Sequence, residues 1–370
     1  MKKLCHILTG LLTLALNVIH DLSSQPLPAP VKLNAGSDYL YLCRDAGAGG
    51  AEEMPDICRT ASGKLIVVFL AGFAHASPPT PTLPKGGRIC YAFSADEGKT
   101  WTNPQILADT GEDDRDPSIV KLADGTLFCT FINSTPEAAW KGTLFCTSRN
   151  NGKSWSAPQR LIENFLTSQP PRILSTGEII LPLYRQDQAT ANGAVMISKN
   201  STATWSKAIE IDNNGLYLNA ETDVIQLKNG DLYAVQRAQH GIMQFSISKD
   251  KGESWSISQP LPFAGITPCL LRSTGGIIVL AYGPVFENKR WSTGLRYSLD
   301  ECRTWSDLVM ADHVLGCHPT LVNLKDGSIL LGYYDENTGP LPSDRSDIRL
   351  RKFSISPEGI TWLSWSHDRK

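Results

Sequence analysis

Apolar residues along the chain fall into short runs that are interrupted by glycine-centred turns. The first two extend from Ile57 to Phe69 around Gly63 and from Ile119 to Phe131 around Gly125. Similar runs surround Gly177, Gly230, Gly276 and Gly327. Short apolar runs split by Asp-Gly, Asn-Gly or Thr-Gly are typical of β-hairpins. No segment of useful length has helical periodicity, so the pattern predicts an all-β protein.

A second repeat is in phase with the first. The octapeptide Ser94–Trp101 (SADEGKTW) recurs at Ser148–Trp155, at Ser248–Trp255 and, with Cys302 in place of glycine, at Ser298–Trp305. Two degenerate copies complete the set, at Ser198–Trp205 and Gly359–Trp362. Repeats with a period near fifty residues indicate solenoids or propellers.

Each period holds about four short strands, and the octapeptide is expected to form the turn between the last two. Asp and Gly suit a tight bend, while Ser, Thr and Trp attach it to its sheet. Six such units closing in a ring make a six-bladed β-propeller, in which closure leaves only short, protected sheet edges. The octapeptides are therefore expected to be structural and peripheral.

The N-terminus predicts export. Lys2 and Lys3 precede an apolar stretch from Leu4 to Ile19, and small polar residues follow at Ser23 and Ser24. This order is typical of a signal peptide, with a single N-terminal anchor as the alternative. We expect a signal over residues 1–24, a Pro-rich leader over 25–39 and the propeller over 40–370. The protein is then secreted or periplasmic, and no later segment could span a bilayer.

Composition narrows the function classes. The 370 residues are 41% apolar with a formal net charge of −2, which argues against a nucleic-acid binder. No CxxC pair or recognisable ligand set predicts a metal, and no cofactor is expected. Cys129 and Cys146 share the context Leu-Phe-Cys-Thr, so they are either disulfide partners on neighbouring strands or buried free thiols. A monomer acting on a glycan is expected.

In a propeller, the first strand of every blade delivers its N-terminal residues to one central mouth. The residues nine before the turn glycines are Met54, Asp116, Ser168, Glu221, Thr267 and His318. Glu53 and Arg115 precede two of them, and Arg172 lies nearby. Because inner strands are otherwise apolar, these charged groups indicate a functional pocket, with ring-closing salt bridges as the alternative.

The octapeptides are Asp boxes, and roughly residues 40–366 resemble the sialidase (neuraminidase) superfamily of BNR-repeat propellers. In that family three arginines bind the substrate carboxylate, an Asp is the acid/base, and a Tyr–Glu pair forms the nucleophile. The resemblance implies that Glu221 is the proton-accepting glutamate, and that Arg237 and Arg290 are the second and third arginines. Planar guanidinium groups suit a carboxylate because they donate two parallel hydrogen bonds.

Three positions depart from that family. Glu53-Met54-Pro55 stands where its first arginine precedes Ile-Pro, so Arg115 would have to replace the missing clamp. Lys85–Arg88 offers no acid where the acid/base Asp is expected, and His318 occupies the place of the nucleophilic Tyr. We therefore expect catalysis by Glu221, His318, Asp116 and Glu53. The expected substrate-binding residues are Arg237, Arg290, Arg115, Arg172, Arg185, Tyr184, Tyr282 and Tyr334.

The leading hypothesis is a glycoside hydrolase that releases terminal sialic acid or a related acidic sugar, as an exo-α-sialidase does. One alternative is a glycosidase or polysaccharide lyase for uronic-acid or other sugars, in which His318 is catalytic. The other is a non-catalytic glycan-binding propeller that kept the pocket and lost the nucleophile.

Overall fold

The computed structural model describes residues 39–43, 50–81, 84, 86–135, 140–186, 191–213, 215–216, 221–237, 241–285, 293–312, 314, 316–337 and 345–365. The predicted signal peptide over 1–24, most of the predicted leader and Arg290 lie outside these residues. Within them every regular element is a strand, and no helix is long and apolar enough to cross a membrane.

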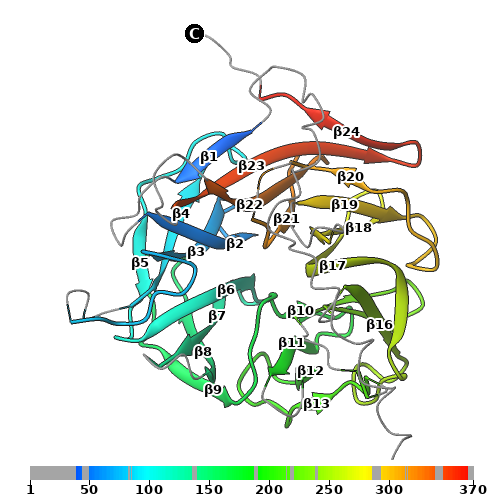
Figure 1. The fold of residues 1–370 in the computed structure, drawn as a ribbon, viewed down its shortest axis with the longest axis horizontal. Coiled ribbons are helices and arrows are strands. Elements are labelled where there is room, and N and C mark those ends of the chain that lie inside the picture. Colours follow the sequence, from blue (N-terminus) through cyan, green and yellow to red (C-terminus); the bar gives the residue numbers. More distant parts are fainter. Residues whose placement is uncertain are drawn as a thin grey trace, which may run out of the picture.

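Six antiparallel blades surround a central axis, which confirms the predicted β-propeller (Figure 1). Blade 1 consists of β2 (Ala51–Arg59), β3 (Leu65–Gly72), β4 (Arg88–Ser94) and β5 (Gln105–Ala108). Blade 2 consists of β6 (Asp113–Lys121), β7 (Leu127–Ser134), β8 (Trp140–Ser148) and β9 (Gln159–Glu163). Blade 3 consists of β10 (Arg172–Ile173), β11 (Ile179–Gln186), β12 (Ala191–Ser198) and β13 (Ile209–Glu210).

Blades 4 and 5 share one long strand. Blade 4 contains β14 (Thr222–Gln226), β15 (Leu232–Gln236) and β16 (Ile242–Ser248). The first half of β17 (Gln259–Arg272) pairs with β16 as the outer strand of blade 4, and its second half pairs with β18 as the inner strand of blade 5. Blade 5 continues with β18 (Ile278–Pro284), β19 (Gly294–Ser298) and β20 (Val309–Met310).

Blade 6 joins the two ends of the described chain. It contains β21 (Thr320–Asn323), β22 (Ile329–Asn337), β23 (Arg345–Ser356) and β24 (Gly359–Leu363). The N-terminal strand β1 (Leu40–Cys43) pairs with β23 as well, so β23 holds strands from both ends of the propeller. The Arg349 guanidinium lies 4.2 Å from the ring centre of Tyr39, and this cation–π contact helps to hold β1 in place. Ring closure therefore uses both termini.

The Asp boxes form the expected turns at five positions, including the degenerate copy that begins at Ser198. In the first box, Ser94 Oγ accepts a hydrogen bond from Gly98 N at 2.8 Å, Asp96 Oδ1 accepts from Thr100 N, and Trp101 Nε1 donates to the Gly98 carbonyl. Cys302 takes the glycine position of its box with φ of 66°, a conformation that glycine adopts more easily. The sixth predicted copy is different, because Gly359–Trp362 belongs to strand β24 rather than to a turn.

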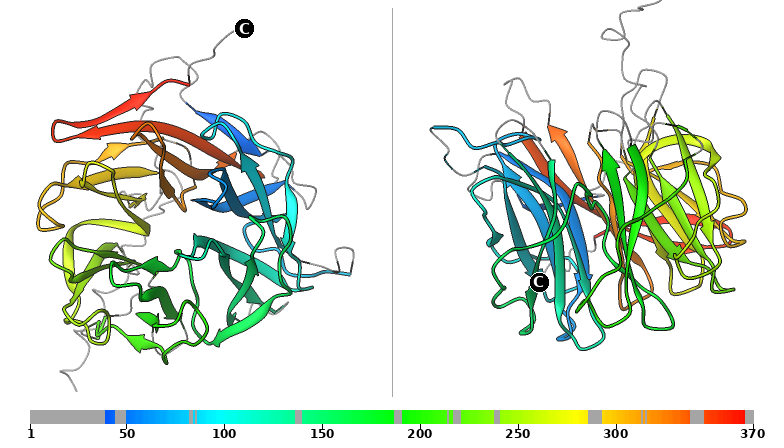
Figure 2. Two further views of the ribbon diagram at one scale, coloured as in Figure 1. Left: turned by 180° about the vertical axis from the view of Figure 1, so that it is seen from behind. Right: turned by 90° about the horizontal axis from the view of Figure 1, so that it is seen from below.

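The core lies between the faces of neighbouring blades. One cluster packs Ile66 and Val68 of blade 1 against Ile119 and Phe131 of blade 2, and similar clusters fill the other interfaces. Burial of apolar area on this scale is the main stabilising contribution to the fold. Figure 2 shows, from a second direction, how the blades stand around the axis.

Two cysteines face each other inside this core. Cys129 on β7 and Cys146 on β8 are direct cross-strand partners, as their shared sequence context suggested. Both are fully buried and both are free thiols. Burial raises the pKa of Cys146 to about 12, so its thiol stays protonated.

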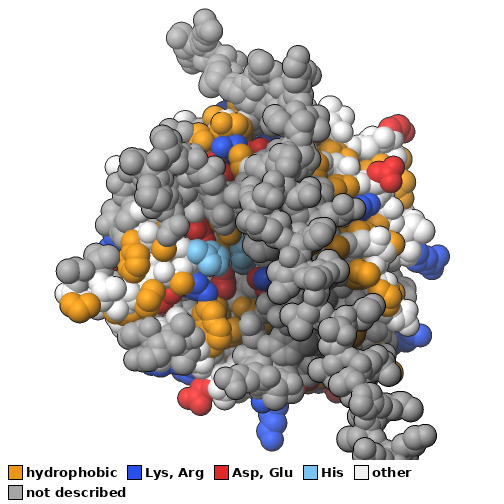
Figure 3. All heavy atoms as spheres, in the orientation of Figure 1, with side chains coloured by type: hydrophobic (Ala, Val, Ile, Leu, Met, Phe, Trp, Pro, Cys, Tyr) orange, Lys and Arg blue, Asp and Glu red, His pale blue; other side chains and the backbone are white. Residues whose placement is uncertain are grey.

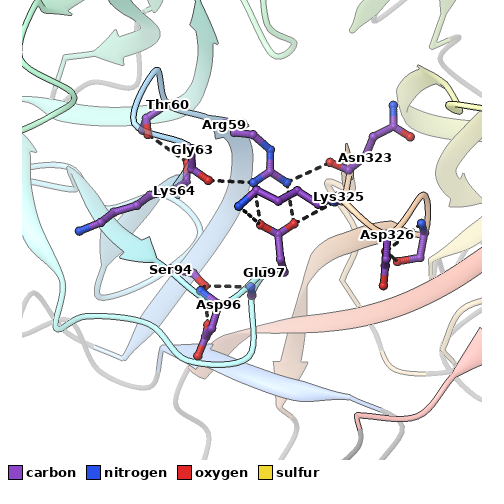
Figure 4. A network of polar contacts seen from close by, with 12 residues as sticks. Arg59, Thr60, Gly63, Lys64, Ser94, Asp96, Glu97, Asn323, Lys325 and Asp326 are labelled. Atoms are coloured by element: carbon purple, nitrogen blue, oxygen red, sulfur yellow. Dashed lines mark hydrogen bonds and ion pairs between the residues drawn. The ribbon is translucent and has the colours of Figure 1, made fainter.

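The Asp boxes of blades 1, 2, 4 and 5 also contact the inner hairpin of the preceding blade. Arg59 of blade 1 donates to both carboxylate oxygens of Glu97, which follows Asp96 in the box, and to the carbonyl of Gly63 (Figure 4). Glu97 in turn accepts from the backbone amide of Lys325 in blade 6. This clasp lies on the face opposite the mouth, at the turn end of the inner strands, and we call that face the base.

Candidate functional site

The mouth is built on a backbone irregularity that recurs around the ring. Met54, Asp116, Thr267 and His318 have positive φ angles of 54°, 49°, 51° and 45°. A proline follows each of them, and the strand register shifts at this point in blades 1, 2 and 5. Left-handed backbone at non-glycine residues costs free energy and gathers at functional sites. The bulge directs equivalent residues of several blades toward one axis.

A narrow cavity opens on this axis. It is lined by Met54, Pro55, Asp56, Asp116, Pro117, Ser168, Gln169, His318 and Pro319, and it has room for about one water molecule. Asp116 Oδ1 and Ser168 Oγ are both buried without a hydrogen-bond partner among the described residues. Buried polar atoms are normally paired, so this cavity is polar and suited to water. It is too small for a sugar, which must bind above it.

Glu221 is the centre of one group at the mouth. Its Oε1 lies 2.8 Å from Arg237 Nη1 and 3.8 Å from His318 Nε2, and its Oε2 accepts from Thr267 N at 2.9 Å. The carboxylate is 6% exposed, whereas the Arg237 side chain keeps 23% of its surface exposed. The structure therefore brings together Glu221 and Arg237 of blade 4 and His318 of blade 6.

Asp116 lies beside this group. Burial raises the pKa of Asp116 and outweighs the opposing charges of His318 and Arg115. The negative charge of Glu221 raises it further. A buried carboxyl with a raised pKa keeps its proton to higher pH than an exposed one. Asp116 therefore binds its proton more tightly than an exposed aspartate does.

Glu53 forms a second group with a residue that the sequence did not single out. Its Oε2 lies 2.5 Å from His75 Nδ1, and its Oε1 accepts a 2.7 Å hydrogen bond from Ser346 Oγ. The carboxylate is only 1% exposed, so it reaches the mouth through His75 rather than directly. His75 follows β3, the strand that returns from the base to the mouth. A histidine just after a strand that ends at the mouth could have been noticed in the sequence. It belongs to no repeated position, however, so the repeat pattern did not mark it.

Arg115 lies between the two groups and is largely committed to protein partners. Its Nη1 donates to the His75 carbonyl at 2.7 Å, its Nε lies 3.8 Å from Asp113, and its guanidinium lies 4.6 Å from the Trp140 ring centre. It is 7% exposed. Its position fits a residue that fixes the loop carrying His75 better than an open carboxylate clamp.

Two of the predicted tyrosines border the site. The Tyr334 ring centre lies 6.0 Å from that of His318 and 6.4 Å from that of His75, between the two imidazoles. Tyr184 is buried near Asp116 and Glu221, and burial together with these carboxylates raises the pKa of its phenol. A protonated phenol at this place can donate a hydrogen bond to a substrate.

Three predicted binding residues lie away from the group. Arg172 pairs with the fully buried Asp223 between blades 3 and 4. Arg185 forms an ion pair with Glu210 on the outer strand of its own blade. Tyr282 is 1% exposed and accepts from Arg296 Nε inside the core between blades 4 and 5. Repeat position predicted that these residues border the mouth. Instead, Arg172 and Tyr282 bind partners between blades, and Arg185 binds an exposed partner on the outer strand of its blade.

Figure 3 shows the face that carries the mouth. The imidazole atoms of the described histidines lie in the hollow at its centre, beside acidic and basic side chains. His75 and His318 are the only histidines among the described residues. The described residues contain no group of three or more His, Cys, Asp or Glu side chains that could hold a metal ion.

Comparison with known proteins defines the class. Residues 88–267 match the BNR repeat-like domain family. The matched stretch is a little under half of the chain, and it contains the Asp boxes that begin at Ser94, Ser148, Ser198 and Ser248. No curated protein sequence matches it significantly.

Solved structures place this propeller beside the sialidases. A protein of unknown function from Dyadobacter fermentans superposes with a TM-score of 0.74 at 18% identity, covering 86% of this chain and 98% of that one. The intramolecular trans-sialidase of Ruminococcus gnavus gives 0.66 at 14% identity, covering 85% and 96%. The Hadza microbial sialidase Hz136 gives 0.65 at 17% identity, covering 85% and 68%. The chain shares the fold of these proteins.

Proposed function

We propose that the protein is a glycoside hydrolase that releases a terminal acidic sugar, such as a sialic acid, from a glycan. One observation carries the proposal: Arg237, Glu221 and His318 form a linked group at the rim of the axial cavity. The fold supports it, because a microbial sialidase and an intramolecular trans-sialidase have the same propeller fold.

His318 acts as the base that activates water for attack on the anomeric carbon. Imidazole is a common general base in enzymes, and the Glu221 carboxylate lies beside this one. The 3.8 Å separation leaves room for a small adjustment when substrate binds. Arg237 holds Glu221 and presents a positive charge to the substrate carboxylate. Asp116 lies beside these residues and lines the axial cavity.

The predicted export signal fits this activity. Acidic sugars are terminal groups of extracellular glycans, so we place the enzyme in the periplasm or outside the cell, as a monomer that needs no cofactor. Detection of the processed chain in a periplasmic or culture fraction, cleaved near residue 24, tests the location.

The activity is tested with fluorogenic sialosides and with other acidic glycosides. Glu221→Gln and Arg237→Lys should each lower kcat/KM by an amount equivalent to about 2–4 kcal/mol of transition-state stabilisation. Arg272→Lys is the matched control, because Arg272 binds Glu301 at the base, and it should leave kcat/KM unchanged. Unchanged kcat/KM in both mouth variants would remove the Glu221 group from the active site.

A second candidate is favoured by His318 itself. An imidazole beside the phenol of Tyr334 suits proton abstraction from a uronic acid, which is the first step of β-elimination. Turnover of a uronic-acid polysaccharide to unsaturated products, without turnover of sialosides, would favour this lyase reaction. Binding of acidic glycans without any turnover would instead identify a non-catalytic lectin.

A further inference from the structure

The pair formed by His75 and Glu53 has the construction of a proton-transfer site. His75 Nδ1 is engaged with Glu53 Oε2 at 2.5 Å, so Nε2 is the nitrogen left to meet a ligand. The His75 side chain is 55% exposed, whereas that of Glu53 is 1% exposed. A buried carboxylate behind an exposed imidazole fixes the tautomer and stabilises the imidazolium, as the aspartate does in a catalytic triad.

The parts around the pair restrict its motion. Ser346 Oγ donates to the second oxygen of Glu53, so the carboxylate is held from both sides. Arg115 Nη1 donates to the His75 carbonyl. Ser77 Oγ accepts from the amides of Phe73 and Ala74, which closes the turn that carries the imidazole. A catalytic group needs support of this kind to keep its geometry.

The pair also lies at the right place in the mouth. Tyr334 separates the His75 ring from the His318 ring, with centre distances of 6.4 and 6.0 Å. The two imidazoles therefore border the same opening, and each has its own buried carboxylate. His318 is only 12% exposed, so it lies deeper than His75. His75 is the more exposed of the two imidazoles, so it is the one that a glycan entering the mouth meets first.

We propose that His75, held by Glu53, is the proton donor to the leaving group, an inference that rests on the proposed hydrolase activity. As the glycosidic C–O bond breaks, its electron pair stays on the departing oxygen, which takes the proton from His75 Nε2. Water adds to the anomeric carbon and gives one proton to His318. One water is consumed, and both imidazoles then return to their starting states by exchanging a proton with solvent.

The charges that face His75 favour this role. Burial alone would lower the pKa of His75, but the hydrogen bond and negative charge of Glu53 outweigh burial and raise it. Arg115 lowers the pKa and Asp116 raises it, and both lie on the neighbouring strand β6. The imidazole is thus more fully protonated near neutral pH than an isolated histidine, as a general acid requires.

The test compares two leaving groups on the same sugar. His75→Gln should reduce kcat/KM by about 10²–10⁴-fold for a natural alkyl glycoside, which needs protonation to depart. For the nitrophenyl glycoside the loss should be under about tenfold, because nitrophenolate departs unaided. In Glu53→Gln the high-pH limb of the rate profile should move to lower pH. Ser346→Ala is the control: the Glu53–His75 contact remains, and the limb should move less.

A second readout does not depend on activity. The imidazole pKa of His75, followed by NMR and assigned with His75→Gln, should fall in Glu53→Gln; an unchanged value would overturn the pair. Equal losses on both glycosides would overturn the proton donor while the hydrolase stands. If the wild-type protein cleaves neither glycoside, the proposed function fails and the role of His75 fails with it. Circular dichroism confirms that each variant is folded.

Discussion

The base and the mouth of the propeller are built from the same repeat but use it in different ways. At the base, Arg59 and Glu97 of blade 1 make the same contacts as Arg272 and Glu301 of blade 5. At the mouth, the equivalent positions hold Met54, Asp116, Ser168, Glu221, Thr267 and His318, of which no two are alike. The repeat therefore fixes where mouth residues lie, and departures from the repeat determine which chemistry they carry.

The clasps show how closely the base repeats. Arg59 binds both oxygens of Glu97 at 2.8 and 2.7 Å, and Arg272 binds both oxygens of Glu301 at 2.8 Å. Each arginine also donates to the carbonyl of its own turn glycine. The two copies stand in blades 1 and 5, so the same clasp forms at two blade interfaces.

Halfway between base and mouth, two buried aspartates show a partial repeat. Asp56 and Asp223 occupy equivalent positions in blades 1 and 4. Each accepts from the amide of the following residue and from one amide of the next blade, Ile119 or Leu270. The third donor differs. Asp56 accepts from the Thr320 hydroxyl, whereas Asp223 binds the Arg172 guanidinium. One buried aspartate is thus held by a neutral hydroxyl and the other by a charged guanidinium, so the two kinds of partner can be compared directly.

The largest effect on stability is expected where the buried aspartate has the charged partner, at Arg172 and Asp223. Arg172→Met should lower the free energy of unfolding by about 3–5 kcal/mol, because it leaves Asp223 as a buried charge without its partner. Thr320→Val, at the equivalent interaction, should cost only about 1–2 kcal/mol. Chemical denaturation at neutral pH measures both. Arg172→Lys and Thr320→Ser are matched controls that keep the donor, and each should recover part of the loss. Equal costs for the two substitutions would show that the two aspartates are held alike.

This comparison separates what the sequence could predict from what it could not. The blades, the Asp boxes and the inward position of residues 54, 116, 221 and 318 follow from a periodic pattern that local turn chemistry enforces. The ion pair of Arg172 could not be predicted in this way, because its partner Asp223 lies 51 positions along the chain and only packing brings the two together. The same reason explains Tyr282, whose phenol meets Arg296 in the core.

His75 was missed for a different reason. It stands in the loop between β3 and β4, outside the residue pattern that the blades share, so no repeat position marks it. Its partner Glu53 was predicted to act on substrate, yet its burial makes it a support for His75 instead. Departures from a repeat at loop positions carry function here, and a pattern search finds only departures at repeated positions.

The second-largest expected effect is a change of folding stability with pH at Asp56. Burial raises the pKa of Asp56 to about 6, despite the hydrogen bonds from Ile119 and Thr320. Because the folded pKa lies above the unfolded one, the stability that protonated Asp56 contributes is fully present below pH 4 and is lost as pH rises through 6. The wild-type protein should therefore lose about 2 kcal/mol relative to Asp56→Asn between pH 4 and 7. Urea denaturation of both proteins across this range measures it. A stability difference that stays constant with pH would show that Asp56 does not titrate in this window.

The smallest effect tests whether the base repeats in energy as well as in geometry. Hydrogen bonds from Arg59 and Arg272 lower the pKa values of Glu97 and Glu301 to about 2, so both clasps are charged at neutral pH. A double-mutant cycle with Arg59→Met and Glu97→Gln should give a coupling energy of about 1 kcal/mol, since these side chains are about a quarter exposed. The cycle with Arg272→Met and Glu301→Gln should agree within about 0.5 kcal/mol, the usual error of such sums. Coupling energies that differ by more would mean that equal contact distances do not bring equal stability at the two interfaces. The contrast between a repeated base and a varied mouth would then hold for structure alone.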